Sequence, residues 1–144
     1  MNNRRKFIKS TSVLIASAGM MGYQVVYSKN KIRLIDKTLK EGMLQHNVYF
    51  WLKSGLDNKD QKNFEKGLKD LVSSVKEVNK AEIGIPAPTP ARDVVDKSFG
   101  YSLFVWFKSI EDHNIYQDHP AHKKFIDDCS KYWTKVQVFD SELI

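Results

Sequence analysis

Tyr116-Gln117-Asp118-His119-Pro120-Ala121-His122 is the stretch that decides how the second half of this chain folds. Proline fixes its own φ and disfavours helical geometry in the residue before it. One helix is therefore expected to end near Tyr116, and a second to begin with Pro120 in its first turn. His119 is expected to cap the second helix. The stretch also brings together a phenol and two imidazoles. Imidazole is the side chain whose ordinary pKa lies nearest neutral pH.

The pattern of apolar residues around this corner predicts an α+β fold. Strands are expected over residues 45–53, 81–85, 99–107 and 133–139, and short helices over 109–116 and 120–132. A longer helix is expected from Asn58, where Gln61 three residues later resembles a capping box. The resulting order, β-α-β-β-α-α-β, is the ferredoxin-like plan: a four-stranded antiparallel sheet with helices on one face. Its longer helix carries one apolar stripe, formed by Phe64, Leu68, Leu71, Val72 and Val75.

The alternation of side chains along the strands predicts an oligomer. His46, Val48 and Phe50 share the face that the helices would cover. The opposite face would expose a large aromatic patch, which monomers rarely tolerate. Its members are Tyr49, Trp51, Phe104 and Trp106. We expect a homodimer through this face. The alternative is cover by residues 29–43, which offer few apolar groups.

The charge balance argues against a nucleic-acid partner. The formal net charge is +6, but residues 1–28 hold four basic groups and no acidic group. The remainder has 19 basic and 17 acidic groups, which is too little excess for a phosphate-binding face. The single Cys129 cannot form a disulfide within the chain.

The N-terminus is similar to a twin-arginine export signal. Arg4 and Arg5 precede an apolar run over residues 13–26, and residues 26–28 make an imperfect cleavage site. We expect residues 1–28 to be a signal, residues 29–43 a poorly ordered connector, and residues 44–144 the folded domain. The protein would then be periplasmic or otherwise exported, with no stable membrane anchoring once the signal is removed. A retained anchor is the alternative, because the run is near the lower length limit for spanning a bilayer.

Four segments together resemble the stress-responsive A/B barrel family, also called Dabb. The corner has the form Tyr-x-x-His-Pro-x-His after Phe107-Lys108-Ser109-Ile110-Glu111. The other three segments are His46-Asn47-Val48-Tyr49-Phe50-Trp51-Leu52-Lys53, Thr89-x-x-Arg92-x-Val94-Val95-Asp96-x-Ser98 and Trp133-x-x-Val136-x-Val138-Phe139-Asp140. They occur in the family's order over about residues 44 to 140. The resemblance implies two sheets packed face to face as a dimeric α/β barrel.

The same resemblance implies a site. The family includes a plant polyketide cyclase whose catalytic Tyr and His correspond to Tyr116 and His122. By that resemblance, His122 would be a general base, and Tyr116 would hold a carbonyl or enolate oxygen. The equivalent of His46 lines that pocket, and a tyrosine that lines it corresponds to Leu68 here, which puts the substrate in question. The expected ligand-binding residues are His46, Val48, Phe50, Phe64, Leu103, Val136, Val138, His119 and Arg92.

Other roles stay open for the same residues. A Tyr and two His at a helix corner serve as often to cap helices and satisfy buried backbone groups. Asp118, His119 and His122 could offer metal ligands, but Pro120 spoils a simple helical pair, so we expect no metal and no cofactor. Arg92 and Asp96 could form a salt bridge to a partner chain or an anion clamp at the pocket mouth. Asp140 could pair with an imidazole.

Two hypotheses therefore remain. The first is an exported dimeric module that binds a small molecule or serves a stress response, without strong catalysis. The second is a cofactor-independent lyase or cyclase acting on a carbonyl, polyketide-like substrate. A cavity of roughly 300 Å³ or more touching His46, Tyr116 and His122 would favour a ligand-processing site, and a filled interior would favour a structural role.

Overall fold

The computed structural model describes residues 23–28, 31–36 and 39–144. The chain divides into two units after Asp36, and each is described by itself. In the first unit, β1 (Tyr23–Ser28) and β2 (Lys31–Asp36) form an antiparallel hairpin. Strand β1 lies within the segment expected to be a signal, and β2 lies within the expected connector, so the sequence analysis predicted neither strand. Ile32 and Leu34 of β2 do alternate with polar residues, as strand residues do. Residues 1–22, which hold the expected twin-arginine motif, lie outside the described residues.

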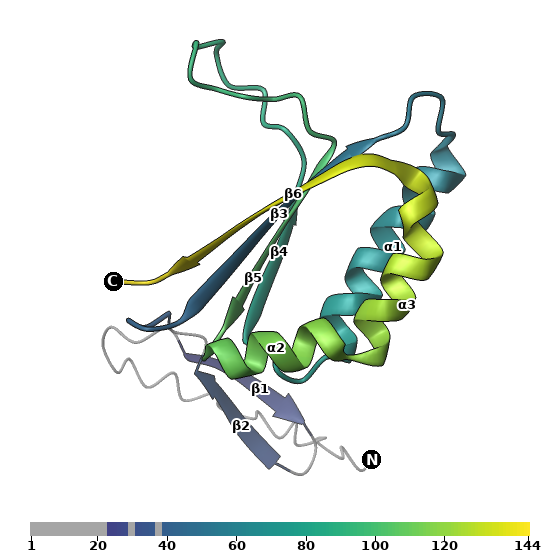
Figure 1. Cartoon of the computed structure of the whole chain (residues 1–144). Coiled ribbons are helices and arrows are strands. Elements are labelled where there is room, and N and C mark those ends of the chain that lie inside the picture. Colours follow the sequence, from purple (N-terminus) through teal and green to yellow (C-terminus); the bar gives the residue numbers. More distant parts are fainter. Residues whose placement is uncertain (1–22, 29–30, 37–38) are drawn as a thin grey trace, which may run out of the picture. The chain divides into compact units, whose positions relative to one another are not determined.

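The second unit has the predicted ferredoxin-like order. Its strands are β3 (Leu44–Leu52), β4 (Lys80–Gly84), β5 (Tyr101–Phe107) and β6 (Trp133–Glu142). They form one antiparallel sheet in the order β4-β5-β3-β6. Figure 1 shows the three helices on one side of this sheet, as expected. The sheet of one chain is open and does not close into a barrel.

Helix α1 (Asn58–Ser74) starts at a cap one residue earlier than predicted. Asp57, in extended geometry, accepts a hydrogen bond at 2.7 Å from the backbone N–H of Asp60. A carboxylate satisfies a free amide of the first turn better than the Asn58 side chain could, because it also complements the helix dipole. The predicted apolar stripe is confirmed, since Phe64, Leu68 and Leu71 are buried.

The corner forms as the sequence predicts. Helix α2 (Ile110–Asp118) is capped by Ser109, whose Oγ accepts from the N–H of Asp112 at 3.1 Å. His119 ends α2 and caps α3 (Pro120–Cys129), with its Nδ1 accepting from the N–H of Ala121 at 3.1 Å. Pro120 stands at the start of α3, and a short 3₁₀ turn, Ser130–Tyr132, leads into β6. The proline therefore separates two helices that a continuous turn would have merged.

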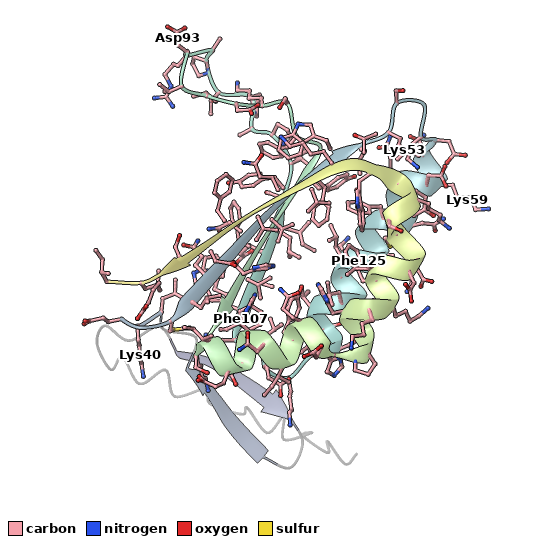
Figure 2. The ribbon with its side chains drawn as sticks, in the orientation of Figure 1. Lys40, Lys53, Lys59, Asp93, Phe107 and Phe125 are labelled. Atoms are coloured by element: carbon pink, nitrogen blue, oxygen red, sulfur yellow. The ribbon has the colours of Figure 1, made fainter. Side chains whose placement is uncertain are left out.

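The core fills the space between the sheet and the helices. Phe64 from α1, Val105 and Phe107 from β5, and Tyr116 from α2 are at most 1% exposed. Figure 2 shows the labelled Phe107 and Phe125 side chains in this layer. Period-two alternation is confirmed, because His46, Val48 and Phe50 are all buried on this face.

The opposite face of the sheet matches the expectation except at Trp106. Tyr49, Trp51 and Phe104 are partly exposed, but Trp106 is only 7% exposed within the single chain. Lys80 is its direct cross-strand partner, and the ammonium lies 4.8 Å from the indole centroid. The expectation that Trp106 stands in water is therefore wrong. Part of the cause is that a long lysine side chain can lie over an aromatic ring while its charge stays hydrated.

Candidate functional site

Three predicted side chains converge between the sheet and the helices. His46 lies near the start of β3, Tyr116 near the end of α2 and His122 in the first turn of α3. The ring centroids of Tyr116 and His122 are 4.8 Å apart, and those of His46 and Tyr116 are 6.1 Å apart. All three line one cavity of about 180 Å³. The sequence thus placed these groups together correctly, although their roles stay predictions.

His46 is held by Asp140 across the sheet. The two residues are paired in the β3–β6 register, and His46 Nδ1 lies 2.6 Å from Asp140 Oδ1. A carboxylate can only accept, so Nδ1–H donates and Nε2 keeps its lone pair in the neutral ring. Burial lowers the pKa of His46, and the hydrogen bond and charge of Asp140 oppose this only in part. His46 is therefore a neutral imidazole with a fixed tautomer.

His122 is oriented by the backbone of the preceding helix. Its Nδ1 donates to the carbonyl oxygen of Gln117 at 3.1 Å, which leaves Nε2 as the basic nitrogen. Desolvation by burial lowers the pKa of His122, and the hydrogen bond to Gln117 only partly offsets it. The ring is thus prepared to accept a proton, as a base must be.

Tyr116 offers a hydroxyl to the cavity. The side chain is 1% exposed, and desolvation raises the pKa of its phenol, so it stays protonated. Within the described part of the chain, the Tyr116 oxygen has no hydrogen-bond partner. It is not fully enclosed, unlike the unsatisfied polar atoms of Glu77, Asn79 and Trp106. Its O–H is therefore available to a small molecule or to water.

The cavity walls are mostly those that were predicted. Val48, Phe50, Leu103, Val136 and Val138 all line it. Phe64 does not, because it is fully buried in the core beside Phe50, with ring centroids 5.2 Å apart. The sequence analysis missed four further lining residues, namely Leu71, Gln117, Phe125 and Trp133. The helical spacing of Leu71 with Leu68 could have suggested the first of them.

Besides Phe64, two other predicted ligand-binding residues do not line the cavity. His119 is the helix cap described above and does not line it. Arg92 lies in the exposed proline-rich loop, next to Asp93. Figure 2 shows Asp93 at the tip of this loop, away from the helices. Asp96 accepts from the N–H of Ser98 at 2.7 Å, and no ion pair joins it to Arg92 among the residues described. A clamp by Arg92 at this cavity is therefore not formed within one chain.

A second hollow lies on the open face of the sheet. It has a volume of about 560 Å³, and Tyr49, Phe104 and the half-exposed Phe139 contribute to its lining. Tyr49 packs edge to face against Phe99, Phe104 and Phe139, with centroid distances of 5.0, 5.8 and 6.2 Å. Phe139 was not part of the predicted patch. This aromatic surface of Tyr49, Trp51, Phe99, Phe104 and Phe139 is called the open-face patch below.

The cavity volume limits what the helix-side site can hold. At about 180 Å³ it is below the roughly 300 Å³ that would have favoured a ligand-processing site from sequence. It is nevertheless not filled by side chains. A hydroxyl donor and two imidazole acceptors on apolar walls can bind a carbonyl group and exchange a proton with its neighbouring atoms.

No helix in the described ranges is long and apolar enough to cross a bilayer.

Comparisons with known proteins agree with this architecture. A Dabb family protein with a ferredoxin-like fold from Mesorhizobium loti is 24% identical and superposes with a TM-score of 0.59, covering 72% of this chain and 99% of its own. A hydroxynitrile lyase from Passiflora edulis is 18% identical, with a TM-score of 0.63 and coverage of 73% and 96%. A dimeric protein of unknown function with a ferredoxin-like fold from Bacteroides fragilis is 20% identical, with a TM-score of 0.57 and coverage of 72% and 98%.

These likenesses establish the fold and no activity. No curated protein sequence matches the chain significantly. The family model of the stress responsive A/B barrel domain matches residues 44–143, which is most of the chain and the whole sheet-and-helix unit apart from its ends. The chain therefore belongs to the stress-responsive A/B barrel domain family.

Proposed function

We propose that this domain binds a small carbonyl compound in the cavity between its sheet and helices. The observation that carries the proposal is the hydroxyl of Tyr116, which lines the cavity, stays protonated and lacks a hydrogen-bond partner within the described residues. An O–H donor that opens into a mostly apolar cavity forms a stronger hydrogen bond with a ligand oxygen than it would in bulk water, so such an oxygen is stabilised there. The Nε2 atoms of His46 and His122 supply acceptors for a hydroxyl on the same ligand.

The walls set the class of ligand. The cavity is lined by valines, leucines and aromatic rings, with polar groups only from His46, Tyr116, Gln117 and His122. Such a site favours a compact, mostly apolar molecule with one or two oxygens. At about 180 Å³ it suits a small aromatic or branched aldehyde or ketone better than a large polyketide.

A direct binding measurement tests the proposal. Benzaldehyde and acetophenone, titrated into ¹⁵N-labelled protein, are expected to shift the amide signals of Gln117 and Val138 with saturation. Tyr116→Phe keeps the ring and removes one hydrogen bond, so it should weaken binding by roughly tenfold. Tyr132→Phe is the matched control, because Tyr132 is also buried but does not line the cavity. Equal affinities in both variants, or no saturable shift, would refute the proposal.

A second candidate function is proton transfer on such a ligand, as a lyase or cyclase. The specific observation in its favour is that His122 is neutral and presents Nε2 as a base beside the Tyr116 hydroxyl. The fold it shares with a hydroxynitrile lyase is consistent with this chemistry and no more. Deuterium exchange at the carbon next to the carbonyl of acetophenone, followed by NMR, should be faster with the protein and lost in His122→Ala. Binding without exchange would leave the domain a binding module.

The functional unit is proposed to be an exported homodimer. The open-face patch is large and aromatic, and a second copy of the same patch is its simplest cover. Several solved structures of similar fold are described as dimeric, which supports the same arrangement. Export through the twin-arginine route rests on the sequence of residues 1–28 alone. A stress-response role rests on the name of the family.

A further inference from the structure

The fold brings together a cluster of metal-type ligands that the sequence did not reveal. His46 lies on β3, His113 on α2 and Asp140 on β6. One ligand atom of each lies within 4.8 Å of those of the other two. The three positions are 67 and 27 residues apart in the chain, so no spacing motif announces them. Strand pairing places Asp140 opposite His46, and α2 brings the His113 ring to 5.0 Å from the His46 ring.

We propose that His46, His113 and Asp140 bind one divalent transition-metal ion of the zinc type beside the cavity. Two imidazoles and one carboxylate are a ligand set that such ions prefer. In a tetrahedral zinc site, neighbouring ligand atoms are about 3.3 Å apart, given Zn–N and Zn–O distances near 2.0–2.2 Å. The present separations, from 2.6 Å between His46 and Asp140 to at most 4.8 Å, bracket that value.

Only small side-chain movements are needed to bring the three ligand atoms around one cation. His46 is buried and fixed in the sheet, whereas the Asp140 side chain is 45% exposed and His113 is partly exposed. Binding requires the proton that His46 Nδ1 shares with Asp140 to leave, so that the nitrogen and the carboxylate can both turn to the cation. Rotation of Asp140 about its own bonds is enough to open that contact.

An outer contact already steadies His113. The side-chain amide of Gln117 lies 2.9 Å from His113 Nε2. The other ring nitrogen has no hydrogen-bond partner among the residues that the structure describes. A metal on His113 Nδ1 places the ring proton on Nε2, and the Gln117 amide must then turn to present its oxygen, which accepts from Nε2–H as the outer partner of a metal-bound imidazole does. The backbone oxygen of Gln117 also accepts from His122. Gln117 therefore contacts one residue of the metal cluster and one residue of the cavity lining.

Three protein ligands leave one coordination position for water or a ligand oxygen, which is the composition of open zinc sites. His46 belongs both to the cluster and to the cavity lining. A bound cation would therefore stand at the edge of the cavity, where it could polarise a carbonyl. This last consequence rests on the proposed carbonyl ligand. Metal binding itself does not.

Zinc and cobalt titrations of the tag-free protein test the proposal. One equivalent of Zn²⁺ per chain is expected by calorimetry, and Co²⁺ should give a visible absorption band typical of four or five coordination. His113→Ala and Asp140→Asn should each weaken Zn²⁺ binding by roughly tenfold or more. His119→Ser is the matched control, because it removes an imidazole of the corner but keeps a residue that caps helices well, so it should bind Zn²⁺ like the unmodified protein.

The outcomes separate this proposal from the carbonyl-binding function. Unchanged Zn²⁺ affinity in both His113→Ala and Asp140→Asn would overturn it, as would an octahedral cobalt spectrum in the unmodified protein. Circular dichroism of the two variants shows whether they fold, and the cobalt spectrum needs no variant at all. Benzaldehyde binding with no metal present would support the proposed function and leave the metal result independent of it.

Discussion

The Nδ1 atom of His46 and the Oδ1 atom of Asp140 lie 2.6 Å apart, at directly paired positions of the first and last strands of the ferredoxin-like sheet. One partner is buried and the other is 45% exposed. The pair therefore ties a central strand to an edge strand at the side of the cavity. It also fixes the tautomer of the neutral His46 ring and leaves Nε2 as its acceptor nitrogen.

Asp140→Asn should cost stability through this pair. The amide can still accept from Nδ1–H, but the charge-assisted bond becomes a neutral one, so the free energy of unfolding should fall by about 1 kcal/mol. Urea unfolding with a chelator present measures this without interference from metal. Asp128→Asn is the control, because that carboxylate makes only an exposed pair with Lys124, and such pairs contribute little. Equal effects in the two variants would argue against a structural role for the His46–Asp140 bond.

His122 should titrate below its ordinary pKa of 6.5, because burial disfavours the imidazolium. The unfolded chain then binds more protons than the folded one just below pH 6.5, so acid favours unfolding. The contribution of His122 to stability is fully present above pH 6.5 and is lost as the pH falls toward the folded pKa. NMR titration of the imidazole signals checks the direction. Thermal melts of His122→Gln should show a flatter acid dependence than the unmodified protein, and an identical slope would contradict the assignment.

Much of this architecture could be predicted because its rules are local. Two-residue alternation assigned His46 and Phe50 to the buried face, and Pro120 fixed the break between the two helices. The α1 cap was misplaced by one residue because Asp57 and Asn58 are both good capping residues, and only the backbone geometry separates them.

The remaining features depend on contacts between distant segments. His113 meets His46 only after α2 has packed on the sheet, and Lys80 covers Trp106 only through the β4–β5 register. Phe64 was expected from the family resemblance to be a cavity wall, but it packs against Phe50 in the core and does not line the cavity. Cavity volume follows from how all these side chains pack, and hydrophobic patterning does not contain it.

The N-terminal expectation has a simple test in a host that possesses the twin-arginine route. Arg4→Lys combined with Arg5→Lys keeps the charge and removes the paired guanidinium groups, so the exported fraction should fall sharply. Cell fractionation and mass spectrometry of the mature N-terminus measure both the location and any cleavage after Ser28. Lys9→Arg serves as the control for charge near the same segment. Normal export of the double variant would indicate another route.

The open-face patch gives the last prediction. In the single chain Phe104 is partly exposed and packs against Tyr49, while Trp106 is already covered, so Phe104 is the better probe of a partner surface. In Phe104→Asp a carboxylate would be buried without a partner in a dimer but would remain hydrated in a monomer. The penalty, on the order of 3 kcal/mol for each subunit, should shift the equilibrium to monomer at micromolar concentration. Ile126→Asp, on the exposed side of α3, is the matched control and should leave the oligomeric state unchanged. Light scattering coupled to size exclusion measures the mass directly. A dimer that survives Phe104→Asp but not Ile126→Asp would move the interface from the sheet to the helices.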